Sequence, residues 1–277
     1  MNPFFRTFAI GLALAATSLS LAQNQSITDD IVTDRPDITE ASSLIPFGSI
    51  QIETGGIYER QEDGALRTEL TTYNTTLLRL GVLKNLELRL GFNNINTRNY
   101  FDGTELDDVQ AGFSPLLLGV KVGISDEDGW VPEAAFIGHI NPRFLASTDY
   151  RPDTTGGDFV FSMSWNLDID GFKFSYGNNL GGRFGEFPGL ALLQSHALGF
   201  DLGNDIGFYA EYYSVSPEGS STDHFVDGGF TWMASRLLQF DVSAGTGIDN
   251  TQQYFVSAGV SYRMDQVFAN RSASDGQ

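Results

Sequence analysis

The residues Leu86-Glu87-Leu88-Arg89-Leu90-Gly91-Phe92-Asn93 alternate between apolar and other side chains. Successive side chains of a β-strand point to opposite faces, so one face of this segment carries Leu and Phe and the other carries Glu, Arg, Gly and Asn. The same alternation recurs in 172–176, 238–243 and 254–263. A period of two, sustained along the chain, predicts an all-β protein.

Twelve such runs are expected, punctuated by Gly, Asn, Asp and Pro. They are 48–59, 66–81, 86–97, 113–124, 130–145, 158–167, 172–183, 193–202, 206–216, 224–233, 238–248 and 253–264. Connections after the even-numbered runs are short, and the long ones (98–108, 146–157 and 184–192) follow odd-numbered runs. Short turns on one rim and longer loops on the other are typical of a single antiparallel transmembrane β-barrel of the outer membrane.

Charge and aromatic positions favour the barrel over a soluble periplasmic β-protein. Charged residues avoid the apolar face of the strands, as a lipid-facing wall requires. A β-sandwich would alternate too, but it would leave edge strands to protect. Trp130, Trp165 and Trp232 all fall at the short-turn end, where an interfacial girdle would place them.

Three prolines interrupt the pattern, because proline lacks the N–H that a strand ladder needs. Pro115 lies in the fourth expected strand, so we expect that strand to begin after it. Pro132 and Pro142 lie in the fifth, where we expect a bulge or a bend.

The amino-acid composition excludes some classes of function. The chain has 277 residues, no cysteine and a net charge of −19, which excludes cysteine chemistry and argues against a nucleic-acid partner. Arg6, an apolar run over 8–16 and Ser20-Leu21-Ala22 predict a signal peptide. The expected organisation is therefore a signal peptide at 1–22, a periplasmic leader at 23–46, the barrel at 47–264 and a polar tail at 265–277.

The segment Thr33-Asp34-Arg35-Pro36-Asp37-Ile38-Thr39-Glu40, followed by a Pro-Gly turn and Gln51-Ile52-Glu53-Thr54-Gly55, resembles the opening of a large family of bacterial outer-membrane barrels. Its members are commonly labelled transporter or phenol-degradation meta-pathway protein. The resemblance covers residues 31–56 closely, and beyond them only the rhythm of strands and turns agrees. It implies an outer-membrane channel or transporter for small molecules, with small hydrophobic or aromatic compounds as the implied solutes.

The charges of the leader allow two readings. Asp34, Arg35, Asp37 and Glu40 could fold into the lumen as a plug and pair with wall charges. They could equally belong to a solvated periplasmic segment.

Polar residues on the inward face of the strands are the candidate pore lining, where they would set solute selectivity or pair and fill a narrow lumen. They are Arg79, Glu87, Arg89, Lys121, Glu133, His139, Arg143, Lys173, Asp201, Glu211, Asp227, Asp241 and Arg263.

An enzyme is not expected. A lipid hydrolase would need a His and a nearby Ser on the outer wall, but no Ser lies two residues after His139, and Ser195 and His196 point to opposite faces. The acidic loops match no calcium-loop spacing, so we expect no metal and no cofactor.

The expected partners are outer-membrane lipid, a small-molecule solute and the barrel-assembly machinery. The last would read the polar-x-Gly-x-x-aromatic pattern of residues 257–264. The rival to a channel is a structural or adhesin-like barrel whose lumen is filled.

Overall fold

The computed structural model describes residues 26–268, so the predicted signal peptide and most of the tail lie outside the described part. The elements are β1 (Ile50–Asp63), β2 (Leu66–Leu83), β3 (Leu86–Phe101), β4 (Thr104–Glu105), β5 (Gln110–Phe113), β6 (Leu117–Ser125), β7 (Glu133–Asn141), η1 (Arg143–Leu145), η2 (Thr148–Tyr150), β8 (Gly156–Ile169), β9 (Phe172–Phe184), β10 (Leu190–Gly203), β11 (Ile206–Pro217), β12 (Asp223–Ser235), β13 (Leu238–Ile248) and β14 (Gln252–Met264). No helix in this part is long and apolar enough to cross a bilayer.

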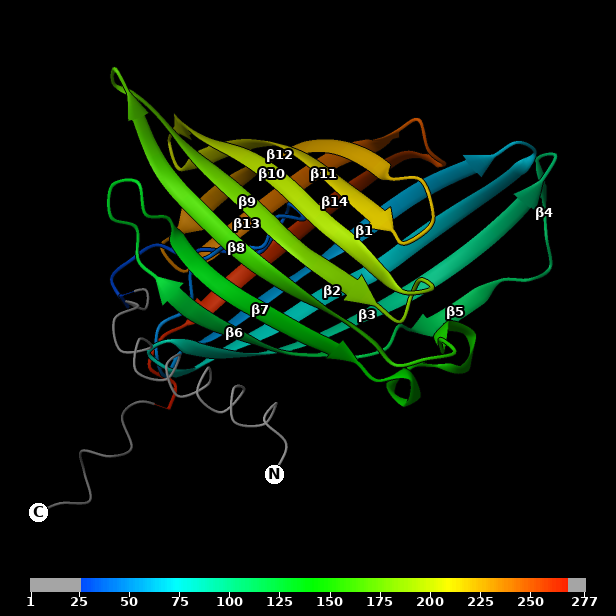
Figure 1. Cartoon of the computed structure of the whole chain (residues 1–277), viewed down its shortest axis with the longest axis horizontal. Helices are drawn as coiled ribbons and strands as arrows, with labels where there is room; N and C mark the ends of the chain where they lie inside the picture. Colours follow the sequence, from blue (N-terminus) through cyan, green and yellow to red (C-terminus); the bar gives the residue numbers. More distant parts are fainter. Residues whose placement is uncertain (1–25, 269–277) are drawn as a thin grey trace, which may run out of the picture.

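The strands form one closed antiparallel barrel (Figure 1). Consecutive strands pair along the wall, except that β3 pairs with β6, and β1 pairs with β14 to close the ring. β4 and β5 pair only with β3, so the wall has twelve strands, as predicted. Closure removes the exposed edges that a sandwich would have, which excludes the sandwich alternative.

The turns follow the predicted asymmetry. Two-residue connections join β8 to β9, β10 to β11 and β12 to β13 on the rim where β1 begins. Asn204 and Asp205 both have positive φ, the backbone of a type I′ hairpin turn. The opposite rim carries the long segments between β3 and β6 and between β7 and β8. By the predicted orientation, the short-turn rim is periplasmic.

Prolines set the limits of two strands. β6 begins at Leu117, two residues after Pro115, as expected. β7 lies between Pro132 and Pro142 and is shorter than the predicted 130–145. Arg143 therefore belongs to the 3-10 helix η1 in a loop and is not a wall residue, which corrects its place among the pore-lining candidates.

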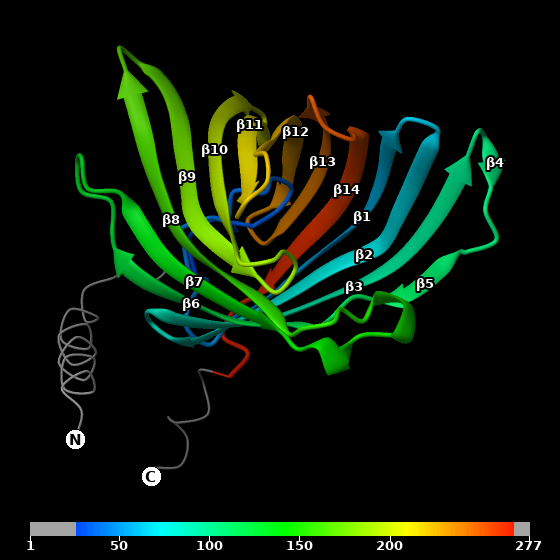
Figure 2. The ribbon, with the colours of Figure 1, turned by 45° about the vertical axis from the view of Figure 1, so that its right-hand side comes forward.

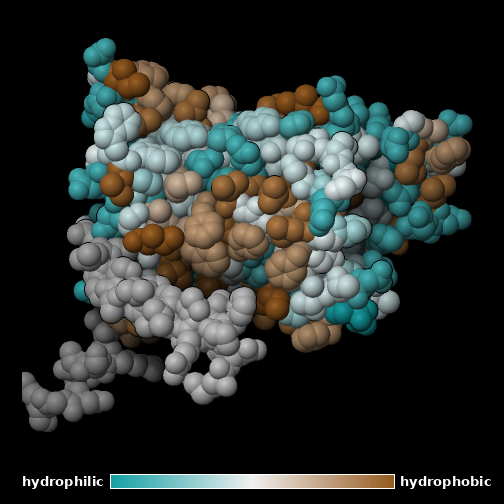
Figure 3. Space-filling view, viewed as in Figure 1, coloured by the Kyte–Doolittle hydropathy of each residue, from teal (hydrophilic) through white to brown (hydrophobic). Residues whose placement is uncertain are grey.

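Burial is inverted relative to a soluble protein. Charged residues such as Arg79, Lys121 and Arg263 are fully buried inside the barrel, whereas large apolar side chains such as Phe230 and Val242 are half exposed on the outer wall. Figure 3 shows apolar side chains gathered across the middle of the visible face. This is the surface of an outer-membrane barrel, whose outer wall meets lipid hydrocarbon.

Aromatic rings concentrate on the outer wall near the short-turn rim. Trp165 stacks on Tyr176 with ring centroids 5.7 Å apart, and Trp232 stacks on Phe240 at 5.6 Å. Trp130, in the connection between β6 and β7, is almost fully exposed. All three tryptophans lie toward this rim, where an interfacial girdle is expected.

Candidate functional site: the barrel interior

The leader runs inside the barrel rather than along its periplasmic side. Figure 2 shows it in blue, enclosed by the strands. Its entry is fixed at the short-turn rim, where the backbone N–H of Ile31 donates to the carbonyl of Arg236 (2.8 Å). Arg263 also binds the leader backbone at this rim, because its Nη2 donates to the carbonyl of Asp29 (2.7 Å).

Asp34 is the centre of the leader's attachment. Its carboxylate lies 3.2 Å from Arg79 Nη1, 3.1 Å from Arg89 Nη2 and 3.1 Å from Lys121 Nζ. Burial acts to raise the pKa of Asp34, but the three cations together outweigh it and hold that pKa well below its usual range. The leader therefore contributes one charge that links β2, β3 and β6.

Three further carboxylates surround these cations. Arg79 pairs with Glu87 (Nε–Oε1 2.7 Å) and with Glu53 (Nη1–Oε1 3.0 Å), and Arg89 pairs with Glu40 of the leader (2.7 Å). We call the set of seven residues the Asp34 cluster: Asp34, Glu40, Glu53, Arg79, Glu87, Arg89 and Lys121. Each of its cations faces at least one carboxylate, so the cluster is a cross-link between leader and wall.

Arg35 points to the neighbouring part of the wall, which runs from β13 through β14 and β1 to β2. Its Nη2 forms an ion pair with Asp241 on β13 (2.9 Å) and donates to Ser257 Oγ on β14 (3.0 Å), and its Nη1 donates to Thr75 Oγ1 on β2 (2.7 Å). The guanidinium lies against Gly55 and Gly259, where a Cβ on either residue would overlap it. These glycines allow the close approach.

Wall side chains also bond the leader's backbone. Glu211 accepts from the N–H of Ile38 (2.8 Å) and of Thr39 (2.7 Å). Asn179 Oδ1 accepts from the N–H of Glu40 (2.7 Å). Thr39 also bonds Ser195 (2.7 Å) through its hydroxyl. Backbone groups that a strand ladder would satisfy are thus satisfied by side chains, so the leader crosses the lumen without joining the sheet.

The leader then passes the next part of the wall. Glu133 of β7 accepts hydrogen bonds from the hydroxyls of Ser42 (2.8 Å) and Ser43 (2.7 Å). Glu87 accepts from the N–H of Ile45 (3.2 Å). The attachment therefore continues to the Pro-Gly turn before β1.

The other candidate residues lie outside these contacts. Asp227 accepts from the Tyr209 hydroxyl (2.7 Å), and His139 pairs with Asp158 through Nδ1 (2.8 Å). Lys173 and Asp201 are exposed near the short-turn rim. The structure thus brings the cations of β2, β3 and β6 together with the leader, whereas His139, Lys173 and Asp201 lie apart from it and Asp227 acts on Asp37 only through its charge.

Several residues of the interior were not singled out from the sequence: Thr39, Ser42, Ser43, Glu53, Thr75, Asn179, Ser195 and Ser257. Glu53 belongs to the opening motif Gln51–Gly55 and alternates with the outward-facing Ile52, so its inward position could have been predicted from the sequence. The serines and threonines carry no such signal, because nothing in the sequence shows which wall positions the leader crosses.

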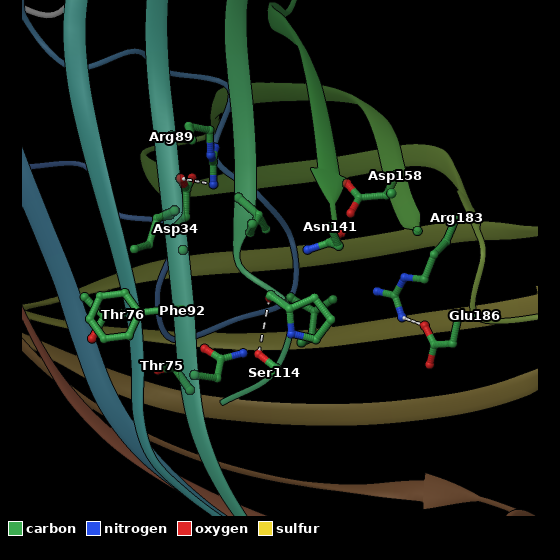
Figure 4. A pocket seen from close by; sticks show the side chains of 18 of the residues that line it. Asp34, Thr75, Thr76, Arg89, Phe92, Ser114, Asn141, Asp158, Arg183 and Glu186 are labelled. Carbon is green, nitrogen blue, oxygen red and sulfur yellow. Dashed lines mark hydrogen bonds and ion pairs between the residues drawn. The ribbon is translucent and has the colours of Figure 1, made fainter. Parts of the chain in front are cut away.

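A cavity of about 750 Å³ lies between the leader and the long-loop rim. Its floor includes Asp34, Asp37 and Ile38, and its upper wall includes Arg183 and Glu186, which face each other 3.1 Å apart (Figure 4). Apolar side chains line much of the rest: Ile57, Leu77, Phe92, Pro115, Leu117 and Phe184. The cavity can hold a small organic molecule.

The histidines are held by groups other than serine. His196 and His224 lie on the outer wall, where each accepts or donates at Nδ1 with a tyrosine hydroxyl (Tyr176 and Tyr212, both 2.7 Å). In residues 26–268 no serine hydroxyl bonds a histidine ring, so a serine–histidine pair is not assembled in this part.

Several solved structures resemble the chain. An outer membrane channel from Pseudomonas putida F1 matches with a TM-score of 0.56 and 10% identity over 84% of this chain and 100% of that one. The translocator domain of the autotransporter NalP from Neisseria meningitidis matches with a TM-score of 0.49 and 10% identity, over 94% and 96%. The first likeness shows a shared fold. No curated protein matches the chain.

Residues 33–264 match the family described as "Putative MetA-pathway of phenol degradation". The match begins at the Thr33-Asp34-Arg35-Pro36 segment, which carries the Asp34 cluster and Arg35, and ends with β14. It spans residues 33–46 of the leader and the whole barrel together. The chain belongs to this family of outer-membrane barrels.

Proposed function

We propose that the protein is an outer-membrane channel for the passive passage of small molecules, and that its leader narrows the lumen as a plug. The observation that carries the proposal is the cavity of about 750 Å³ above a segment that is not part of the wall. Side-chain contacts hold that segment, so its displacement breaks no strand pairing.

The cavity lining supports a mostly apolar solute. Ile38 is more than half exposed on the floor of the cavity, and Phe92, Leu117 and Phe184 line its sides. Small hydrophobic or aromatic compounds, which the family description suggests, fit this lining. Neutral molecules would pass Arg183 and Glu186 at the rim, because neither charge binds them strongly.

A filled structural barrel is the second candidate, and a specific observation favours it. Arg79, Glu53, Glu87 and Lys121 have no exposed surface, so no solvent-accessible passage runs between the leader and the wall at these residues. The two candidates differ in whether the leader ever leaves this position.

Uptake by proteoliposomes separates the two candidates. The mature chain would be reconstituted with entrapped stachyose and diluted into isosmotic solutions of small solutes such as glycine or arabinose. A channel predicts swelling that is faster for the smaller solute and faster again when residues 23–40 are deleted. Inserted, folded protein that gives no swelling in either form would refute the channel and favour the filled barrel.

A further inference from the structure

Polar side chains gather on the outer wall across β9, β10 and β11. We call this set the outer polar patch, and its residues are Tyr176 and Asn178 of β9, Gln194 and His196 of β10, and Tyr212 of β11. His196 pairs in register with Asn178 on one side and with Tyr212 on the other. The rings stack in a row, because the centroids of Tyr176 and His196 are 6.1 Å apart and those of His196 and Tyr212 are 6.3 Å apart. The patch is therefore one packed surface.

The outer polar patch lies within the lipid-facing band and not at its edge. Residues of β10 alternate between the lumen, where Ala197 is buried, and the outer wall. Leu192 is exposed on the long-loop side of Gln194, and Leu198 is exposed on the short-turn side of His196. Apolar outward residues thus lie both above and below the patch, so lipid hydrocarbon surrounds it.

Hydrogen bonds within the patch leave two amide oxygens without a donor. A side-chain N–H of Gln194 donates to Nε2 of His196 (2.7 Å), so Nδ1 of His196 carries the ring proton and donates to the hydroxyl oxygen of Tyr176 (2.7 Å). A side-chain N–H of Asn178 donates to the carbonyl of Ser195 (2.9 Å). In the described part of the chain, no group donates to Gln194 Oε1 or to Asn178 Oδ1. The side chain of Gln194 is exposed, so this unsatisfied amide meets the membrane.

An unsatisfied amide in hydrocarbon costs free energy, because lipid tails offer no hydrogen bonds. Contacts between proteins within a membrane use Asn, Gln and His side chains as hydrogen-bonding groups and small residues for close approach. Small outward residues are present beside the patch, where Ala210 of β11 pairs with Gly228 of β12. The patch is therefore suited to a protein contact at this depth of the membrane.

The exposed amide of Gln194 is complementary to itself. It offers one acceptor oxygen and one free N–H, so two such amides related by a two-fold axis can form two reciprocal hydrogen bonds. An axis parallel to the membrane normal would place both amides at the same depth. None of the five patch residues is Asp, Glu, Lys or Arg, so two copies of the patch would not repel each other.

We propose that the outer polar patch is the contact surface of a homodimer, in which Gln194 lies at the two-fold axis and pairs with the same residue of a second copy. The stacked rings of Tyr176 and Tyr212 fix His196, and His196 orients the amide of Gln194. The contact is independent of the proposed channel function, because the patch faces away from the lumen.

Cross-linking in the outer membrane tests the homodimer. The chain has no cysteine, so Leu192→Cys introduces a single thiol next to Gln194 and leaves the amide in place. Val256→Cys is the matched control, since Val256 is an exposed wall residue in the middle of β14. Membranes would be treated with bismaleimidohexane, which joins two nearby thiols. We expect Leu192→Cys to give a band of twice the mass of one chain, and Val256→Cys to give roughly tenfold less of it.

Gln194→Leu in the Leu192→Cys protein tests the amide itself. Leucine is favourable on a lipid-facing wall, so the barrel should fold, and its heat-dependent mobility in gels would establish that it has. The cross-linked band should fall roughly tenfold. An unchanged yield would show that Gln194 does not hold the two copies together and would overturn the proposal.

Sedimentation equilibrium of the purified mature chain in a density-matched detergent measures the mass independently. We expect the mass of two chains for the unmodified protein and of one chain for Gln194→Leu. A single-chain mass without a cross-link at Leu192→Cys would overturn the homodimer. Equal cross-linking of the Leu192→Cys and Val256→Cys proteins would also overturn it, because random collision would explain both.

Two further outcomes would give the patch to a different occupant and so would overturn the homodimer. One is cross-linking of Leu192→Cys to a different protein. The other is lipopolysaccharide that co-purifies with a single unmodified chain and is lost from Gln194→Leu.

Discussion

Replacement of Asp34 by Asn tests whether the leader is held by charge. The change removes the one leader carboxylate that faces Arg79, Arg89 and Lys121, all within 3.2 Å of it, in a site where Asp34 has 4% of its side chain exposed. Loss of one partner of a buried ion pair costs about 3–5 kcal/mol. Glu40, Glu53 and Glu87 remain beside the cations, so we expect the lower end of that range.

About 3 kcal/mol corresponds to roughly a 100-fold change in the equilibrium between attached and detached leader. Hydrogen exchange measures this equilibrium, because the N–H groups of Ile38 and Thr39 are bonded to Glu211 only while the leader is attached. Asp34→Asn should therefore lower the protection of these amides by roughly 100-fold, with the strand amides unchanged. Asp30→Asn, at an exposed leader carboxylate, is the matched control.

Unchanged protection at residues 38–40 in Asp34→Asn would refute this account of the attachment. An equal loss of protection in the leader and in the strands would also contradict it, because it would show that Asp34 stabilises the barrel as a whole.

Three further predictions concern the leader and the wall. Gly259→Ala places a Cβ against the guanidinium of Arg35 and should displace the leader without changing any charge, seen as faster proteolysis of the leader in a barrel that stays folded. Val242→Arg puts a cation on the lipid-facing wall and should lower the free energy of unfolding by about 2–4 kcal/mol, measured by urea titration of liposome-inserted protein. The control is Ser243→Arg, whose side chain points inward, so it places no charge in lipid and should not show this loss of stability. Burial and a neighbouring wall carboxylate raise the pKa of Asp37, so this carboxyl group binds its proton more tightly when the leader is attached than when it is detached. Attachment of the leader should therefore weaken as the pH rises through the raised pKa. Asp37→Asn should remove this pH dependence of attachment, measured by hydrogen exchange of the leader amides.

Much of the wall could be predicted because lipid imposes a simple rule on it. The alternation in residues 86–93 reappears as β3, with Glu87 and Arg89 buried inside and Leu88 exposed outside. A shift of one residue in the pairing of a strand would turn its charged side chains toward lipid, and the free-energy cost of that charge excludes such a shift. The exception is Arg143, since Pro142 ends the strand before it.

The interior was harder to predict because its contacts join residues far apart in the chain. Arg35 bonds Asp241 and Ser257, more than 200 residues away, and neither distance nor direction follows from strand alternation. The register shift between β1 and β2 is a further feature that strand alternation did not predict, although residues 71–76, Thr-Thr-Tyr-Asn-Thr-Thr, interrupt the apolar face of β2 there.

Single-channel recording in a planar bilayer tests the central claim, that the barrel is a channel narrowed by its leader. The mature chain should give small, discrete current steps. A variant that lacks residues 23–40 should give larger ones, because the segment that carries Asp34, Arg35 and Glu40 no longer crosses the lumen. Silence from both proteins, once folding and insertion are demonstrated, would contradict the channel, and equal steps from both would contradict the plug.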